Sequence, residues 1–188
     1  MEETLMAYRN GTYIAFHAEG NADPTASDIK YYRMMIAWRA RDGSAFPFYN
    51  SHDKVPAVRD SSQAETIKRS LRLRLDSSKN MVLIIGQTTR FDNDYVPYEI
   101  AYAVDTCRIP IIATYPGQGV ILTPNALRGL WPEALRARID GYKANVIHIP
   151  FHRKTVEDAI SQFSHNNLPV GGGLGHYSAD AYRSFGLL

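Results

Sequence analysis

Apolar and polar positions along the chain follow two patterns, one typical of buried strands and one typical of helices that cover a sheet. The run Met81–Ile85 is apolar at every position, as a central parallel strand buried on both faces should be. In residues 28–41, apolar side chains recur near the i, i+3, i+7 spacing of a helix. These patterns predict strands over residues 12–16, 46–49, 81–86, 109–113 and 144–149, and helices over residues 28–41, from 62 past 75, 95–106, 127–139 and 155–163.

The predicted strands and helices alternate from one end of the chain to the other. Strands separated by helical crossovers favour a parallel sheet with helices on both faces. Right-handed crossovers leave few topologies, and we predict a flavodoxin-like, three-layer α/β fold with a central, mainly parallel five-stranded sheet. We assign residues 1–167 to this single domain. Residues 168–188, which contain Gly171, Gly172, Gly173 and Gly175, are predicted to be a Gly-rich C-terminal tail.

Composition and charge narrow the class of protein. The chain has 188 residues, of which 45% are hydrophobic, so one domain with a substantial core is expected and a wholly disordered chain is excluded. The net charge of +2 lacks the basic excess of a dedicated nucleic-acid binder, and no nucleic-acid partner is expected. Cys107 is the single cysteine, which excludes a disulfide within the chain and a four-cysteine zinc site.

The start of the chain and its hydropathy bear on location. Residues 1–4 are acidic rather than basic and no apolar h-region follows them, so we expect no signal peptide. The longest clean apolar run, Met81–Ile85, is far shorter than the ~20 residues that span a bilayer. A cytoplasmic protein with no membrane contact is the expectation.

The loops after the first and third predicted strands are the expected place for chemistry. In doubly wound sheets, ligands bind beyond the carboxyl ends of the strands, at the point where the strand order reverses. The helix after the third strand begins at this edge, and Tyr95 and Glu99 lie four residues apart on one of its faces. A carboxylate beside an aromatic ring can stabilise positive charge that develops on a sugar. The plainer interpretation of Glu99 is a solvated residue near a positive helix N-terminus.

Other groupings carry weaker signals. Residues 51–53 are Ser, His and Asp, but adjacent residues cannot face one another as a catalytic triad. His148 and His152 flank a strand end rather than sharing a helix face, so we expect no metal site there. The basic cluster within residues 68–74 is interpreted as a solvated helix face.

Three stretches of the chain resemble a known family. They are Phe16-His17 at the first strand end, Leu83-Ile84-Ile85-Gly86-Gln87-Thr88 at the third, and Tyr95-Val96-Pro97-Tyr98-Glu99-Ile100 in the following helix. Together they resemble the TIR-like domains of bacterial anti-phage defence, most of all the TIR sensor enzymes of the Thoeris system, over residues 11–115. The family more often has Trp at the position of Tyr95, and Pro97 is unusual in that motif.

This resemblance implies a TIR fold, which agrees with the predicted sheet, and an enzyme that cleaves the nicotinamide–ribose bond of NAD. The glutamate that acts there in the family corresponds to Glu99, and NAD is the substrate, with no separate cofactor. Thoeris enzymes of this kind are triggered by phage infection and make a cyclic ADP-ribose isomer. The partners implied are therefore NAD, a downstream effector protein reached through a diffusible nucleotide, a phage component as trigger, and further copies of the chain in a homo-oligomer.

The resemblance also suggests which residues contact NAD. We assign catalysis to Glu99 and no metal to the site. The candidate substrate-binding residues are aromatic rings for stacking, polar side chains at the ends of the first and third strands, and two positions in the loop after the second strand: Phe16, Tyr49 and Tyr95; His17, Gln87 and Thr88; Asn50 and Asp53.

Two other functions stay open at this point. A nucleoside deoxyribosyltransferase-like glycosidase also uses a glutamate and an aromatic ring, but it forms a covalent glycosyl intermediate and need not hold a pyrophosphate. A non-enzymatic TIR-like interaction module keeps the sheet without needing the carboxylate. Convergence of Phe16, Tyr95 and Glu99 on one concave pocket would favour an enzyme, whereas a solvent-facing Glu99 would favour the module.

Overall fold

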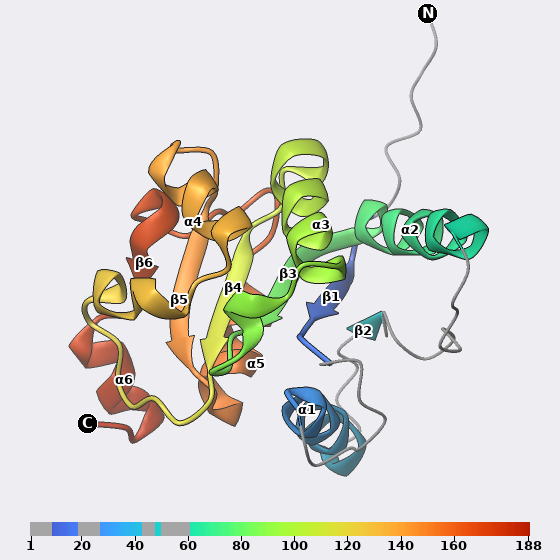
Figure 1. The fold of residues 1–188 in the computed structure, drawn as a ribbon. Helices are drawn as coiled ribbons and strands as arrows, with labels where there is room; N and C mark the ends of the chain where they lie inside the picture. The colour runs from blue at the N-terminus through green and yellow to red at the C-terminus, as the bar shows by residue number, and fades with distance from the viewer. Residues whose placement is uncertain (1–8, 19–26, 43–47, 50–60) are drawn as a thin grey trace, which may run out of the picture.

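The computed structural model describes residues 9–18, 27–42, 48–49 and 61–188, which build one parallel sheet with helices on both faces (Figure 1). The strand order is β2-β1-β3-β4-β5-β6, and every neighbouring pair is parallel. The elements are β1 (Gly11–Ala15), α1 (Ile29–Asp42), β2 (Phe48–Tyr49), α2 (Ser61–Asp76), β3 (Ser78–Ile84), α3 (Tyr95–Ala101), β4 (Ile111–Tyr115), α4 (Glu133–Asp140), β5 (Val146–Pro150), α5 (Arg153–Gln162), β6 (Gly175–His176) and α6 (Ala179–Phe185).

The sheet separates two hydrophobic clusters, because successive side chains of a strand point to opposite faces. In β1, Tyr13 and Ala15 belong to the cluster that packs against α2, α3 and α4. Ile14 and the following Phe16 belong to the cluster that packs against α1, α5 and α6. The central strand β3 is buried along its apolar part, with Met81–Ile84 at 0% exposure. The predicted α/β, flavodoxin-like arrangement with its parallel sheet is confirmed.

The strand order reverses between β1 and β3. Chain order runs outward from β1 to β2 on one side, and from β3 through β6 on the other. Ala15 at the end of β1 pairs with Leu83 near the end of β3, so the loops that follow these two strands leave the sheet side by side. This is the edge at which doubly wound sheets bind ligands.

The helix after β3 changes character partway along. α3 is regular from Tyr95 to Ala101 and continues as a π-helix over Tyr102–Cys107. It ends at Arg108, whose backbone has the left-handed φ of 54°. The predicted helix over residues 95–106 therefore exists as one α segment and one π segment, and the next strand begins at Ile111 rather than 109.

The C-terminal segment differs from the predicted tail. Gly175 pairs with Ile147 and extends the sheet as β6, and Tyr182 of α6 is fully buried. His148 of β5 donates from Nε2 to the carbonyl oxygen of Gly173 over 2.9 Å, since a carbonyl can only accept. Residues after 168 thus pack on the domain, because the glycines let the chain approach β5 closely: a Cβ at Gly175 would lie 2.6 Å from the carbonyl oxygen of Val146.

No helix in the described part of the chain is long and apolar enough to cross a membrane. Within the same residues, no three His, Cys, Asp or Glu side chains lie together as a metal site would require. Cys107 is buried and free, as a small apolar residue late in a helix would be.

Candidate functional site

Glu99 lies in the second turn of α3 and faces the sheet rather than solvent. Its side chain is 1% exposed. The phenol of Tyr13, in β1, donates a hydrogen bond to its Oε1 over 2.5 Å. The other oxygen, Oε2, is also buried and has no hydrogen-bond partner in the described part of the chain. A buried carboxyl group with one unpaired oxygen is costly, and such groups concentrate at sites that act on a ligand.

The surroundings of Glu99 favour its protonated form. Burial raises the pKa of Glu99 from 4.5 to about 8, because a desolvated carboxylate loses its hydration. The hydrogen bond from Tyr13 opposes this rise, and the negative charge of Asp92 adds to it. Near neutral pH the group is therefore poised between acid and carboxylate, as acid–base groups in active sites often are.

A second polar pair joins the two loops at the switch point. Nδ1 of His17, after β1, lies 2.7 Å from Oδ2 of Asp92, in the loop after β3. Oδ1 of the same carboxylate accepts a hydrogen bond of 2.8 Å from the backbone N–H of Asp94. Asp92 therefore holds the start of α3 to the end of β1, and its charge reaches Glu99.

The loop after β3 is braced from the side of α1. The backbone N–H of Gly86 donates to Oγ1 of Thr89 over 2.8 Å, and that hydroxyl donates to Oδ2 of the buried Asp28 over 2.8 Å. Any larger residue at position 86 would force Asp28 to move, since a Cβ there would lie 2.1 Å from Oδ1 of Asp28. This close approach shapes the Gly-Gln-Thr turn that follows the central strand.

A cavity of about 180 Å³ opens beside this turn. Gln87 and Thr88 line it from the β3 loop, and Lys30 lines it from the first turn of α1. The Lys30 ammonium also lies 4.9 Å from the centre of the Tyr31 ring. The complete lining is Ser27, Asp28, Lys30, Tyr31, Gly86, Gln87, Thr88 and Pro116. Polar groups, the cation Lys30 and the carboxylate of Asp28 therefore gather at the carboxyl edge of β3, which suits the hydroxyl groups of a sugar, with Lys30 as the one cation for a phosphate.

The aromatic residues proposed from the sequence do not converge on one pocket. Phe16 is 3% exposed and stacks on Tyr32 of α1, with ring centres 4.9 Å apart and planes at 19°. It therefore lies on the opposite face of the sheet from Glu99. Tyr95 is half-buried and packs against the cluster on the Glu99 face. The structure brings Tyr95 and Glu99 to one face and leaves Phe16 in the core of the other.

The remaining proposed residues fall partly outside the described chain. The backbone of Tyr49 pairs with Tyr13 in the ladder of β1 and β2. Asn50 and Asp53 lie outside the described residues. His17 contacts Asp92, and the negative charge of Asp92 acts in turn on Glu99.

Sequence reasoning missed Tyr13 and Asp92 as partners of this site. Tyr13 sits in the middle of an apolar strand and is a common core residue, but strand alternation does place it on the face opposite Phe16. Asp92 belongs to a polar loop with several equivalent candidates. Only the hydrogen bonds to His17 and to the Asp94 amide single it out.

The basic cluster on α2 is less solvated than predicted. Arg72 donates to the phenol oxygen of Tyr98 over 2.9 Å, and the Lys68 ammonium lies 5.4 Å from the centre of the same ring. The hydrogen bond with Tyr98 raises the pKa of Arg72. Two of the four cations thus pack α2 against the outer side of the helix that carries Glu99.

Comparison with known families agrees with this fold. The model of the family described as Thoeris protein ThsB, TIR-like domain, matches residues 13–119. The match runs from β1 past β4 and includes Tyr13, Asp92 and Glu99, together with the turn at Gly86. It covers more than half of the chain, and the chain therefore belongs to the TIR-like domain family of the Thoeris anti-phage defence protein ThsB.

Proposed function

We propose that this TIR-like domain protein of anti-phage defence cleaves NAD at the nicotinamide–ribose bond, with Glu99 as the catalytic residue. The observation that carries the proposal is the buried carboxyl group of Glu99, with Oε1 held by Tyr13 and Oε2 unpaired. It lies on the helix that follows the switch-point loop of a Thoeris-family domain. Structural burial alone would leave no reason to keep an unpaired carboxyl oxygen there.

Cleavage of the nicotinamide–ribose bond requires a carboxylate close to the ribose. When the bond breaks, its electron pair goes to the pyridinium nitrogen, nicotinamide leaves neutral, and the ribose carbon becomes an oxocarbenium centre. A carboxylate at Glu99 stabilises that positive charge or holds a ribose hydroxyl in place. Bound NAD carries a positive nicotinamide ring, and a nearby positive charge lowers the pKa of a carboxyl group. Substrate would therefore favour the form of Glu99 that the reaction requires.

The rest of NAD would lie along the same edge of the sheet. Gln87, Thr88 and Lys30 line the cavity beside the β3 turn and supply polar contacts for the pyrophosphate or the second ribose. Tyr95 offers a ring on the Glu99 face. Because Glu99 is covered at 1% exposure, substrate entry requires the side chains above it to move.

The fate of the ADP-ribose part sets the signal. Attack by water gives linear ADP-ribose and a proton. Attack by an atom of the same molecule gives a cyclic product, and a folded-back conformation favours this route through high effective concentration. We propose the cyclic ADP-ribose-type product, which activates a separate effector protein, with a phage component as the trigger and assembly of several copies as a further part of the response.

The test compares the wild type with Glu99→Gln, which keeps the shape of the side chain and removes its charge. Nicotinamide release and product mass are followed with NAD, in buffer and in lysate from phage-infected cells that supplies the trigger. Glu133→Gln, an exposed glutamate of α4, is the matched control. Release by the wild type and the control but not by Glu99→Gln supports the proposal.

Three other results contradict parts of it. Equal release by Glu99→Gln would remove the role of Glu99. Absence of NAD loss in infected lysate would remove the NAD activity and leave an interaction module. Turnover of nucleosides with a trapped glycosyl–enzyme, but not of NAD, would identify a deoxyribosyltransferase-like enzyme instead.

A further inference from the structure

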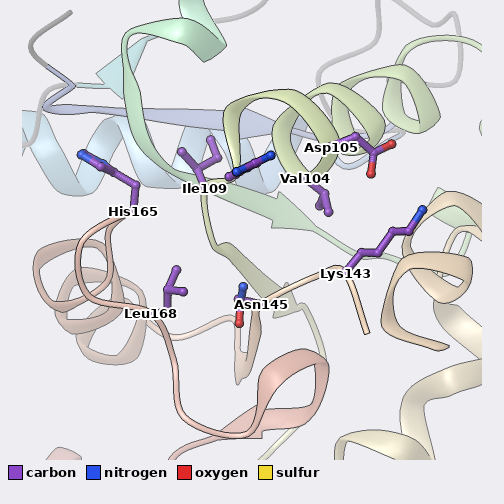
Figure 2. A pocket seen from close by; sticks show the side chains of 8 residues that line it. Val104, Asp105, Ile109, Lys143, Asn145, His165 and Leu168 are labelled. Atoms are coloured by element: carbon purple, nitrogen blue, oxygen red, sulfur yellow. The ribbon is translucent and has the colours of Figure 1, made fainter. Parts of the chain in front are cut away.

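A second cavity, of about 580 Å³, lies at the edge of the sheet opposite the switch-point loops. Figure 2 shows the side chains that line it. Three connections line it, at the amino ends of β4 and β5: the end of the π-helix, the link from α4 to β5, and the loop after α5. Its lining residues are Val104, Asp105, Arg108, Ile109, Lys143, Asn145, His165 and Leu168. The volume falls in the range of ~300–1,000 Å³ typical of small-molecule sites.

The walls of this cavity combine apolar and polar groups. Val104 and Ile109 lie on one side, and Leu168 and Asn145 lie on the other (Figure 2). Small-molecule sites usually have this composition, in which apolar side chains contact the body of a ligand and a few polar groups fix its orientation.

The charge at the cavity is positive. Its one lining carboxylate, Asp105, is held by Arg138, with Nη2 2.5 Å and Nε 3.1 Å from its oxygens. This pairing lowers the pKa of Asp105, and Lys143 lowers it further. Arg108 and Lys143 have no salt bridge of their own in the part of the chain that the structure describes. Two cations therefore remain available to an anion.

Arg108 reaches the cavity from the end of the helix. Arg108 ends the helix with a φ of 54°, a left-handed conformation that glycine or asparagine adopts at lower cost. Helix termination alone would favour one of those residues. At this position the Arg108 side chain lies on the cavity lining.

His165 contributes an unpaired nitrogen on the same lining. Its Nδ1 is buried and has no hydrogen-bond partner among the described residues. Burial lowers the pKa of His165, and the nearby cation Arg9 lowers it further, which keeps the ring neutral at pH 7. A buried polar atom left without a partner is the usual mark of a missing ligand or water.

We propose that this cavity binds a small organic phosphate of about nucleotide size, with the phosphate between Arg108 and Lys143. Asn145 and His165 supply further polar contacts, and Val104, Ile109 and Leu168 contact the less polar part of the ligand. Arginine and lysine together are the usual protein partners of phosphate oxygens. The site is separate from the edge at which Glu99 lies, although the helix that carries Glu99 ends at the cavity.

The test is calorimetric titration of the full chain in the Glu99→Gln background, which suppresses turnover at the other edge. The probes are AMP, inorganic phosphate and adenosine. We expect AMP to bind, phosphate to bind more weakly and to compete, and adenosine not to bind. Lys143→Gln and Arg108→Asn should each weaken AMP by about tenfold, because each removes a charge-assisted contact. Asn is chosen because it tolerates the left-handed backbone.

The controls separate this site from folding effects and from the other edge. Lys143→Arg keeps the charge and should retain AMP binding, and Arg183→Gln neutralises an exposed arginine of α6 and should change nothing. AMP should change the amide NMR shifts of residues 104–109, 143–145 and 165–168. Absence of AMP and phosphate binding at millimolar concentration overturns the proposal. AMP binding that both cavity variants leave unchanged also overturns it. The same holds if AMP changes the amide NMR shifts of residues 86–94 instead. NAD cleavage by the wild type is measured separately, so either proposal can fail alone.

Discussion

Tyr13 and Glu99 share a hydrogen bond of 2.5 Å, although one lies in the first strand and the other in the helix after the third. This bond is the main interaction that works against burial in setting the charge of Glu99, because it stabilises the ionised carboxylate. The strand residue thus tunes the helix residue without needing to touch a substrate. Tyr13 is a positioning residue in the proposed reaction.

Tyr13→Phe should reduce NAD cleavage at neutral pH by raising the pKa of Glu99 above about 8. A carboxylate that must be ionised then becomes scarcer at pH 7, and a rise of one pKa unit would lower the rate by about tenfold. The pH profile of kcat/KM for nicotinamide release measures this shift. At high pH the variant should recover most of its activity. A profile with the same midpoint as the wild type would contradict the argument.

Glu99 should make the folded protein less stable as pH rises. The folded group has a pKa of about 8 and the unfolded group one of 4.5, so the folded state binds the extra proton between these values. The contribution of Glu99 to the free energy of unfolding is therefore fully present below pH 4.5 and is lost as pH rises through 8. The loss is on the order of 5 kcal/mol at ~1.4 kcal/mol per pKa unit.

Denaturant unfolding of the wild type and Glu99→Gln at several pH values tests this linkage. The difference between the two free energies of unfolding should change in favour of the variant from about pH 5 to pH 9. Glu133→Gln controls for the loss of a carboxylate at an exposed position. A constant difference across this range would mean that Glu99 is not buried in solution.

Burial of His148 should make the folded protein less stable as pH falls, which is the opposite of the effect of Glu99. Burial lowers the pKa of His148 to about 4 from 6.5, and its neutral ring accepts from Tyr115 at Nδ1 over 2.6 Å while Nε2 donates to Gly173. Trp131 in turn donates to the Tyr115 oxygen over 2.9 Å. Protonation of the ring would leave Tyr115 without its acceptor. This contribution to stability is therefore full above pH 6.5 and is lost as pH falls through 4.

Acid unfolding of the wild type and His148→Gln measures this second contribution. The wild type should lose stability relative to the variant between about pH 6.5 and pH 4, by on the order of 3 kcal/mol. Hydrogen exchange should show the first opening in the segment around Gly173, which depends on the imidazole. Equal acid sensitivity of both proteins would rule out the buried, neutral histidine.

Gly86→Ala should destabilise the protein by about 2–4 kcal/mol, because the added methyl meets the buried Asp28 carboxylate. The β3 turn would have to shift, so binding at Gln87 and Thr88 should weaken as well. Thermal unfolding measures the first effect. Asp28→Ala added to Gly86→Ala should relieve the clash, and the double variant should be more stable than the sum of the two single changes predicts. Strict additivity would show that the two residues do not touch.

The layout of the sheet was predictable because its physical cause is local. A parallel strand covered on both faces must be apolar at successive positions, and Met81–Ile84 meets that demand. Boundaries were less predictable: the strand expected from residue 109 starts at Ile111, since Pro110 has no N–H to donate to the ladder. The π-helix after Ala101 has only six residues, which are too few for its periodicity to show in the sequence.

The sequence reasoning placed Gln87 and Thr88 at the switch-point edge, where they line a cavity, and it singled out Glu99. Its place on the helix after the central strand followed from the motif, whereas the partner Tyr13 depends on which face of β1 that helix covers. Phe16 was assigned to the same pocket, but the alternation of side chains along a strand sends it to the other face. The C-terminal segment was predicted as a tail because a strand of two residues, Gly175–His176, has no apolar pattern.

That two-residue strand has a further consequence, for the behaviour of the protein in concentrated solution. β6 covers the outer edge of β5, whose five residues Val146–Pro150 are all buried. A chain cut before residue 168 would bare that edge, and an uncovered apolar strand edge is a template for pairing with other chains. Such a truncation should aggregate. The defect would arise three strands away from Tyr13 and Glu99, so poor solubility in a shortened protein would say nothing about its chemistry.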